Sequence, residues 1–120
     1  MATPRAWLVA FLITIAVEAP IVLALTRGSG VSTGRRLALV VFAQLATHPL
    51  VWFVFPQLPG ISGRTATALS ELWAWLAEAA FYAVVFPGVG GLRALGTSAL
   101  ANGASLAVGL LFSPLIRAAG

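Results

Sequence analysis

The stretch LALVVFAQLATHPLVWFVF, residues 37–55, says most about how this chain folds. Only three of its 19 residues, Gln44, Thr47 and His48, carry clearly polar side chains. An α-helix rises about 1.5 Å per residue, so a run of this length matches a bilayer hydrocarbon core about 30 Å thick. The stretch therefore predicts a transmembrane helix that carries polar groups near its centre.

Three further apolar runs of similar length cover residues 6–25, 66–86 and 92–112. The connectors RGSGVSTGRR, PQLPGISGRT and PGVGG are rich in Gly and Pro, which end helices. Because the connectors are short, consecutive helices should be antiparallel neighbours. The sequence predicts an all-α fold, an integral membrane bundle of four antiparallel transmembrane helices, forming one domain over residues 1–120. No internal repeat is evident from the letters.

The composition excludes several classes of protein. The chain is 60% hydrophobic and only 8% charged, with a mean hydropathy of +1.00, whereas soluble domains are about one quarter charged. We therefore expect the lipid bilayer as its partner and a bacterial inner membrane as its location. The arginines are scattered among the connectors, which argues against nucleic-acid binding. The absence of cysteine excludes disulfides and thiolate metal sites.

The first run resembles a secretory signal, since Arg5 precedes an apolar stretch. However, Glu18 falls inside the candidate cleavage site and Pro20 would follow the cut, so we expect a retained membrane helix. The arginine count is almost balanced between the two membrane sides. One side is predicted to carry Arg27, Arg35, Arg36 and Arg93, and the other Arg5, Arg64 and Arg117. The larger count favours a cytoplasmic location for the connectors after the first and third helices.

Polar residues recur at helical spacing within each run, so each set lies on one face of its helix. The sets are Thr14 and Glu18; Gln44 and His48; Glu71, Glu78 and Tyr82; and Ser98, Asn102 and Ser105. One strongly polar residue per helix lies roughly 3 Å from the centre of its run. These four are Glu18, His48, Glu78 and Asn102.

A polar group at that depth is costly unless it finds partners or water, so the four faces should turn toward a common interior. We expect Glu18, His48, Glu78 and Asn102 to form an ion- or proton-binding site. The supporting residues are expected to be Gln44, Tyr82, Ser98, Ser105 and Glu71.

Three classes of function remain open. The favoured class is passage or exchange of protons or a small cation, as an oligomer, because four helices are few for a conduit. The second is a non-catalytic subunit of a larger membrane complex, whose polar residues pair with partner helices. The third is an intramembrane metalloenzyme with Glu18, His48 and Glu78 as metal ligands. Apart from such a metal ion, no cofactor is expected. An H-E-x-x-H zinc site is excluded because the chain has one His, and a Ser-His-Asp triad is excluded because it has no Asp.

Two resemblances accompany these motifs. QLATHPLVW, ELWAWLAEAAFYAVVF and SALANGASLAVGLLF together resemble elements of small, poorly characterised bacterial multi-pass membrane proteins. That resemblance covers the second to fourth helices and implies no activity, and His48 replaces the Asn expected there.

The architecture alone is similar to the small multidrug resistance transporters, which have four helices and one Glu in the first. That similarity implies that Glu18 exchanges protons for a cationic drug. The chain departs from those transporters in carrying Glu71, Glu78 and His48 within its other helices.

Overall fold

The structure is a computed structural model that describes residues 2–120, and in this part of the chain all regular elements are helices. They are α1 (Pro4–Leu25), α2 (Thr33–Phe53), the 3-10 helix η1 (Phe55–Gln57), α3 (Gly63–Val85), α4 (Gly91–Leu111) and α5 (Ser113–Ala118). The segments containing α1, α2, α3 and α4 are long and apolar enough to cross a membrane, with mean hydropathies of 2.5, 1.8, 1.2 and 1.4. The all-helical expectation is confirmed.

The first three long helices begin two to four residues before the apolar runs that predicted them. Each starts at a hydroxyl residue whose side chain accepts a hydrogen bond from a free backbone N–H. Thr3 Oγ1 accepts from Ala6, and Ser62 Oγ accepts from Thr65, both at 3.1 Å. Ser32 Oγ accepts from Arg35 at 3.4 Å. Helix capping, rather than hydrophobicity, therefore sets these boundaries.

The short helix α5 was not predicted, because it lies beyond the fourth apolar run, which ends at residue 112. Pro114 lies in its first turn, where a missing N–H costs nothing. Ile116 of α5 is buried in a small cluster with Ala6 and Ala10 of α1. This contact fixes the C-terminal segment against the start of the first helix.

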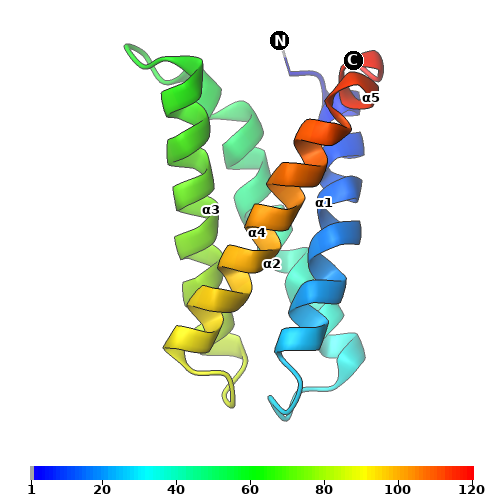
Figure 1. Cartoon of the computed structure of the whole chain (residues 1–120), viewed down its shortest axis with the longest axis vertical. Coiled ribbons are helices and arrows are strands. Elements are labelled where there is room, and N and C mark those ends of the chain that lie inside the picture. Colours follow the sequence, from blue (N-terminus) through cyan, green and yellow to red (C-terminus); the bar gives the residue numbers. More distant parts are fainter. Residues whose placement is uncertain (1) are drawn as a thin grey trace.

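Figure 1 shows how the long helices are arranged. The chain runs downward along α1 and α3 in this view and upward along α2 and α4, so α5 lies at the same end as the start of α1. α1 and α3 each contact both α2 and α4. In the same view α4 leans from the lower end of α3 toward the upper end of α1.

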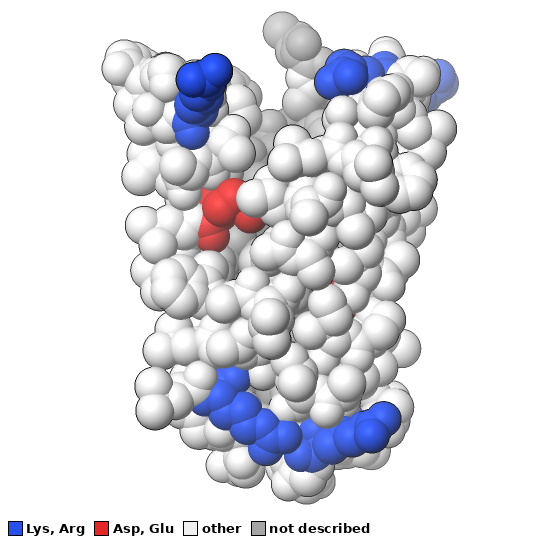
Figure 2. Space-filling view, in the orientation of Figure 1, with Lys and Arg blue, Asp and Glu red and all other residues white. Residues whose placement is uncertain are grey.

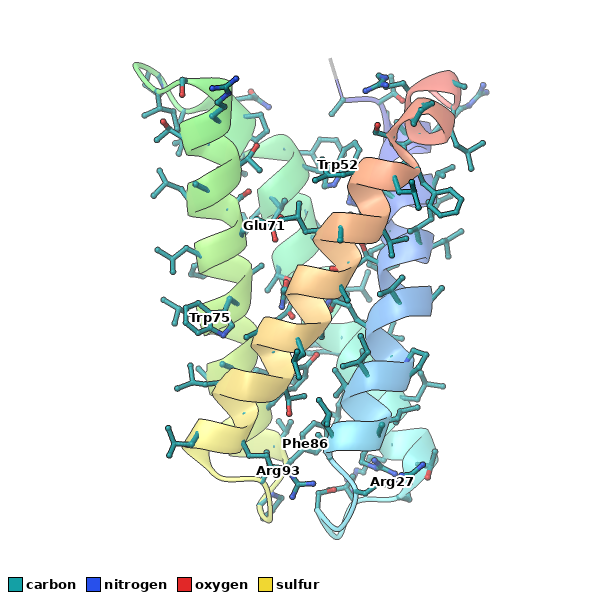
Figure 3. All side chains as sticks on the ribbon, in the orientation of Figure 1. Arg27, Trp52, Glu71, Trp75, Phe86 and Arg93 are labelled. Carbon is teal, nitrogen blue, oxygen red and sulfur yellow. The ribbon has the colours of Figure 1, made fainter. Side chains whose placement is uncertain are left out.

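The apolar core occupies the end of the molecule that carries the connectors after α1 and α3. Val22, Val40, Tyr82 and Phe86 are fully buried there, and Phe86 lies near the lower end in Figure 3. Many leucines remain exposed along the outside, including Leu12, Leu76 and Leu100. Figure 2 shows basic side chains at both ends of the molecule and acidic atoms gathered mainly in a hollow on the visible face.

Candidate functional site

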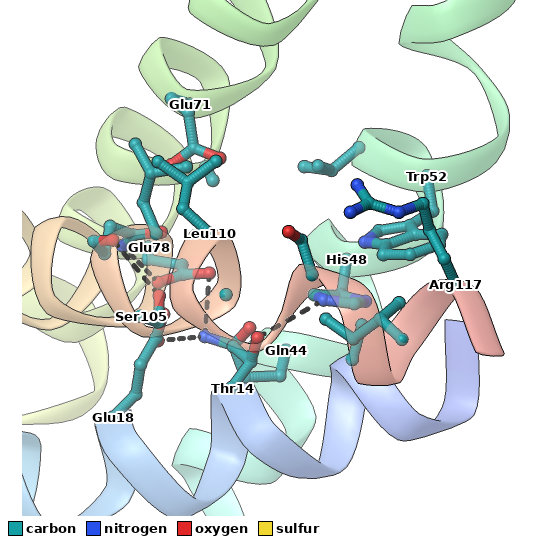
Figure 4. Close-up of a pocket in the computed structure, with 18 residues that line it drawn as sticks. Thr14, Glu18, Gln44, His48, Trp52, Glu71, Glu78, Ser105, Leu110 and Arg117 are labelled. Carbon is teal, nitrogen blue, oxygen red and sulfur yellow. Dashed lines mark hydrogen bonds between the residues drawn. The ribbon is translucent and has the colours of Figure 1, made fainter. Parts of the chain in front are cut away.

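Two carboxyl groups from different helices meet in the interior. Glu18 of α1 and Glu78 of α3 are each only 1% exposed. The side-chain amide of Gln44, on α2, donates one hydrogen bond to Glu18 Oε2 and another to Glu78 Oε1, the latter at 3.0 Å. Figure 4 shows this amide between the two glutamates. Gln44 therefore joins the carboxyl groups into one network.

Three more side chains complete the network. Ser105 donates to Glu18 Oε1 at 2.5 Å, Thr47 donates to Glu78 Oε1 at 2.7 Å, and Asn102 donates to Glu78 Oε2 at 2.8 Å. We call the six residues Glu18, Gln44, Thr47, Glu78, Asn102 and Ser105 the carboxyl cluster. All four long helices contribute to it.

The hydrogen-bond donors of the cluster are all neutral. Within residues 2–120, the side chains that bond to Glu18 and Glu78 are two amides and two hydroxyls, with no arginine or histidine among them. Neutral donors can orient a carboxylate, but they do not cancel its charge. A buried carboxylate without a counter-charge is strongly disfavoured, so bound protons or a cation must balance the pair.

The two helical hairpins, α1 with α2 and α3 with α4, supply equivalent parts of this cluster. Glu78 of α3 follows Glu18 of α1 by 60 positions, and the burial pattern of residues 18–30 is repeated in residues 78–90. On the second helix of each hairpin, Asn102 follows Gln44 and Ser105 follows Thr47 by 58 positions. Each hairpin thus contributes a carboxyl group, an amide and a hydroxyl.

Hydrogen bonds in the cluster follow this repeat. Each carboxyl group accepts from the amide of its own hairpin and from the hydroxyl of the other: Gln44 and Ser105 for Glu18, Asn102 and Thr47 for Glu78. Gln44, being longer than Asn102, also reaches the second carboxyl group. The halves are therefore related by an approximate two-fold arrangement, with the carboxyl groups near its centre.

A cavity of about 300 Å³ leads to the cluster from the end of the molecule that carries α5. Glu18, Gln44, Glu78, Asn102 and Ser105 line its deep part. Its walls are mainly apolar and include Val51, Trp52, Leu106, Leu110 and Ile116, and Arg117 lies on the lining near Trp52. On the opposite side of the cluster, Val22, Val40, Tyr82 and Phe86 close the interior. The carboxyl pair is therefore reached from the half of the molecule that carries α5, where acidic atoms are also visible in a hollow on the side face (Figure 2).

His48 lies on the cavity wall, one helical turn from Gln44, and does not bond to either buried carboxyl group. Its Nε2 lies 3.4 Å from Thr14 Oγ1, and its buried Nδ1 has no partner within residues 2–120. The ring centroids of Trp7, Phe11 and Trp52 lie 5.6 to 6.2 Å from that of His48. The structure places His48 in an aromatic setting beside the cluster.

The other expected residues lie around the cluster rather than in it. Glu71 lines the cavity about 10 Å along α3 from Glu78 and faces the interior in Figure 3. Ser98 donates to the carbonyl of Trp75 and approaches Asn102. Tyr82 is fully buried, and its hydroxyl has no partner in the described chain.

Two points bear on the sequence predictions. Thr47 is a direct partner of Glu78, although it was not among the expected site residues. Its spacing of three from Gln44, the same as that of Ser105 from Asn102, was the available signal.

For the metal alternative with Glu18, His48 and Glu78, residues 2–120 contain no group of three His, Cys, Asp or Glu side chains arranged to hold a metal ion.

The fold and site define a helical protein with membrane-length helices around a buried pair of carboxyl groups. Comparison of the chain with protein-family models, curated proteins and solved structures gave no match.

Proposed function

We propose that this protein is an integral membrane protein of four antiparallel spans that exchanges protons or a small cation at Glu18 and Glu78. The observation that carries the proposal is the buried carboxyl pair, which has only neutral hydrogen-bond partners and lies at the bottom of a cavity. Such a pair requires positive charge from outside the chain, and the cavity gives that charge a route.

Membrane insertion is supported by the distribution of side chains. The long helices carry exposed leucines, whereas arginines gather at the two ends of the molecule. Insertion places the leucines in the acyl region and the arginines at the head groups. The four arginines near the connectors after α1 and α3 favour the cytoplasmic side, so the cavity opens on the other side.

Exchange at a site that is open to one side is the first half of transport. Passage to the other side requires the layer of Val22, Val40, Tyr82 and Phe86 to open. The two hairpins are the natural moving parts, since the carboxyl cluster lies where they meet. We propose that association with further copies supports this movement.

The alternative, a non-catalytic subunit of a larger complex, receives less support from the structure. That role calls for polar faces directed outward, toward partner helices. The polar faces here are buried, with Glu18, Gln44, Glu78 and Ser98 all 2% exposed or less. Their main partners lie within the chain itself.

The test is a flux measurement in proteoliposomes with a pH gradient. Glu18→Gln and Glu78→Gln keep the shape of each side chain and remove its charge, so we expect each variant to abolish pH-linked flux. Glu71→Gln, on the same cavity but outside the cluster, is the matched control and should retain flux. Wild-type flux in both Glu18→Gln and Glu78→Gln would overturn the proposal.

A further inference from the structure

We propose that the species exchanged at the carboxyl pair is the proton, and that Thr47 and Ser105 reorient their hydroxyl groups as Glu78 and Glu18 gain or lose it. This inference rests on the proposed function and narrows it from a small cation to a proton. Thr47 and Ser105 are positioning residues in this scheme, because they act on the carboxyl groups that carry the proton.

The first argument is that the carboxyl oxygens are already occupied by donors. Each of the four oxygens of Glu18 and Glu78 accepts at least one N–H or O–H, and Glu78 Oε1 accepts two. Three of these oxygens keep a second lone pair, but a metal ion would need several oxygens, carbonyl or amide oxygens among them, facing one point. Gln44 and Asn102 instead direct their NH₂ groups at the carboxyl groups. The arrangement suits a proton, which occupies a single lone pair.

The second argument is that both hydroxyls have an alternative acceptor. Ser105 Oγ lies 2.5 Å from Glu18 Oε1 and 3.1 Å from the backbone oxygen of Asn102. Thr47 Oγ1 lies 2.7 Å from Glu78 Oε1 and 3.0 Å from the backbone oxygen of Ala43. A hydroxyl has one hydrogen and two acceptor lone pairs, so it donates to only one of its two neighbours at a time.

These distances allow each carboxyl group to change its protonation state without moving a heavy atom. When Glu18 is ionised, Ser105 donates to Oε1. When a proton from cavity water bonds to Oε1, the Ser105 O–H rotates toward the Asn102 carbonyl, and Ser105 Oγ accepts from the new acid. Release of the proton to water reverses both changes. Thr47, Glu78 and the Ala43 carbonyl repeat this exchange in the other half.

The bridging amide need not move in either state. Both hydrogens of the Gln44 NH₂ group are donated, one to Glu18 Oε2 and one to Glu78 Oε1. Glu18 can therefore take its proton on the oxygen that faces Ser105 while the bridge remains. The hydroxyls adapt to the proton, and the amide holds the carboxyl groups in place.

Other ionisable groups face the same cavity, so their titration must be distinguished from that of Glu18 and Glu78. Glu71 on α3, His48 on α2 and Arg117 on α5 line the cavity, and Tyr82 on α3 lies one turn beyond Glu78. The parts of the cluster on α4, Asn102 and Ser105, do not titrate. Assigning a titration to one glutamate therefore requires the single variants Glu18→Gln, Glu78→Gln and Glu71→Gln.

The experiment is infrared spectroscopy of the protein in liposomes, first during a pH titration at constant Na⁺ and then during a Na⁺ or K⁺ titration at constant pH. The acid C=O stretch of each glutamate is assigned by its loss in the corresponding Gln variant. We expect acid bands of Glu18 and Glu78 that respond to pH and not to the metal ions. Ser105→Ala should shift only the Glu18 band, and Thr47→Val only the Glu78 band.

Matched variants separate this role from a structural one. Ser105→Thr and Thr47→Ser keep the hydroxyl and should preserve the wild-type bands. Ser70→Ala removes a buried hydroxyl that bonds to the Thr67 carbonyl, and it should change neither band. Circular dichroism establishes that each variant retains its helices.

Each other result has a definite meaning. Carboxylate bands that respond to Na⁺ or K⁺ at constant pH overturn the proton assignment while leaving cation exchange in place. Bands that respond to pH but are unchanged in Ser105→Ala and Thr47→Val overturn the role of the hydroxyls. Glutamates that respond to neither pH nor metal ions overturn the proposed function itself, and this inference with it.

Discussion

Ser105 on α4 donates a 2.5 Å hydrogen bond to Glu18 on α1, its partner 87 positions earlier in the chain. The equivalent bond in the other half joins Thr47 to Glu78. Each buried carboxyl group thus depends on a hydroxyl from the opposite hairpin. The cluster is complete only when the two hairpins have docked, so its stability and the packing of the hairpins are linked.

The bridging amide should contribute strongly to stability. Gln44→Leu removes two hydrogen bonds to carboxyl groups and leaves their oxygens with fewer partners. Because a buried acceptor that loses its donor costs about 1–3 kcal/mol, we expect a loss of about 2 kcal/mol in the free energy of unfolding. Chemical denaturation in detergent measures it.

Gln57→Leu is the matched control for this prediction. The side chain of Gln57 is exposed on η1 and, within residues 2–120, its one hydrogen bond goes to the nearby Phe53 carbonyl. Its replacement should therefore leave the unfolding midpoint close to that of the wild type. Equal midpoints for Gln44→Leu and the wild type would show that the bridge contributes nothing.

The accessibility of the cavity can be measured with single cysteines, since the chain has none of its own. Leu106→Cys lies on the cavity wall and should react with a small water-soluble thiol reagent added from the side that carries α5. Val40→Cys, in the fully buried layer beyond the cluster, should not react. Leu100 is 61% exposed on the outside of α4, so Leu100→Cys should be protected by lipid in liposomes and react in the denatured protein. Rapid labelling of Val40→Cys would contradict the proposal that the apolar layer beyond the cluster excludes water.

Gly88 marks a close approach between the two hairpins. A Cβ atom on Gly88 would lie 3.0 Å from the backbone oxygen of Gly28 and 3.2 Å from the Cα atom of Ser29. Since backbone atoms cannot swing away as a side chain does, Gly88→Ala should destabilise the protein by about 1–3 kcal/mol. Thermal unfolding in detergent measures this loss.

Gly91→Ala provides the comparison for Gly88. Gly91 is in the first turn of α4, and a Cβ atom there meets nothing within 4 Å. Alanine also favours the helical state over glycine, so Gly91→Ala should unfold at the wild-type temperature or above it. If Gly88→Ala also unfolded at or above the wild-type temperature, the close contact of Gly88 with Gly28 and Ser29 would be contradicted.

Arg93 joins the start of α4 to the end of α1. Its guanidinium donates to the backbone oxygens of Leu25 and Arg27, each at 2.8 Å, and so satisfies carbonyls where the first helix ends. Arg93→Met should lower the unfolding temperature. Arg35, at the equivalent place in the first hairpin, is exposed like Arg93, but its side chain makes no hydrogen bond within residues 2–120, so Arg35→Met should have a smaller effect. An equal decrease in unfolding temperature for both variants would show that the positive charge, and not the hydrogen bonds of Arg93, stabilises the protein.

The helices could be predicted well because their signal is local. Apolar runs of bilayer length separated by Gly and Pro located all four long helices. The starts of α1, α2 and α3 were placed late because Thr3, Ser32 and Ser62 extend the helices into polar sequence. The helix α5 was missed because six residues carry too little periodicity to be recognised.

The site was predicted in part. The expectation that Glu18, Glu78 and Asn102 meet agrees with the structure, but His48 takes no part in their hydrogen bonds, and Gln44 and Thr47 do. Gln44, Thr47 and His48 all lie within two turns of α2. Successive residues turn by about 100° around a helix, so a modest rotation of α2 decides which of the three faces the carboxyl groups.

The repeat between the hairpins is weak in the letters, because only some equivalent positions, such as Glu18 and Glu78, keep the same residue. Gln44 corresponds to Asn102 and Thr47 to Ser105, and the neighbouring Ala43 and Ala46 are identical to Ala101 and Ala104. The correspondence becomes clear when burial and hydrogen bonding are compared.

The sequence by itself determined the number and length of the long helices, and the presence of one polar face on each, because these properties depend on residues a few positions apart. Only the tertiary structure decided which polar groups pair, that Gln44 bridges two carboxyl groups, and that the cavity lies in the half of the molecule that carries α5. Those features depend on how four helices rotate and tilt against one another. The contacts that fix rotation and tilt join residues 26 to 87 positions apart, beyond the reach of any local pattern.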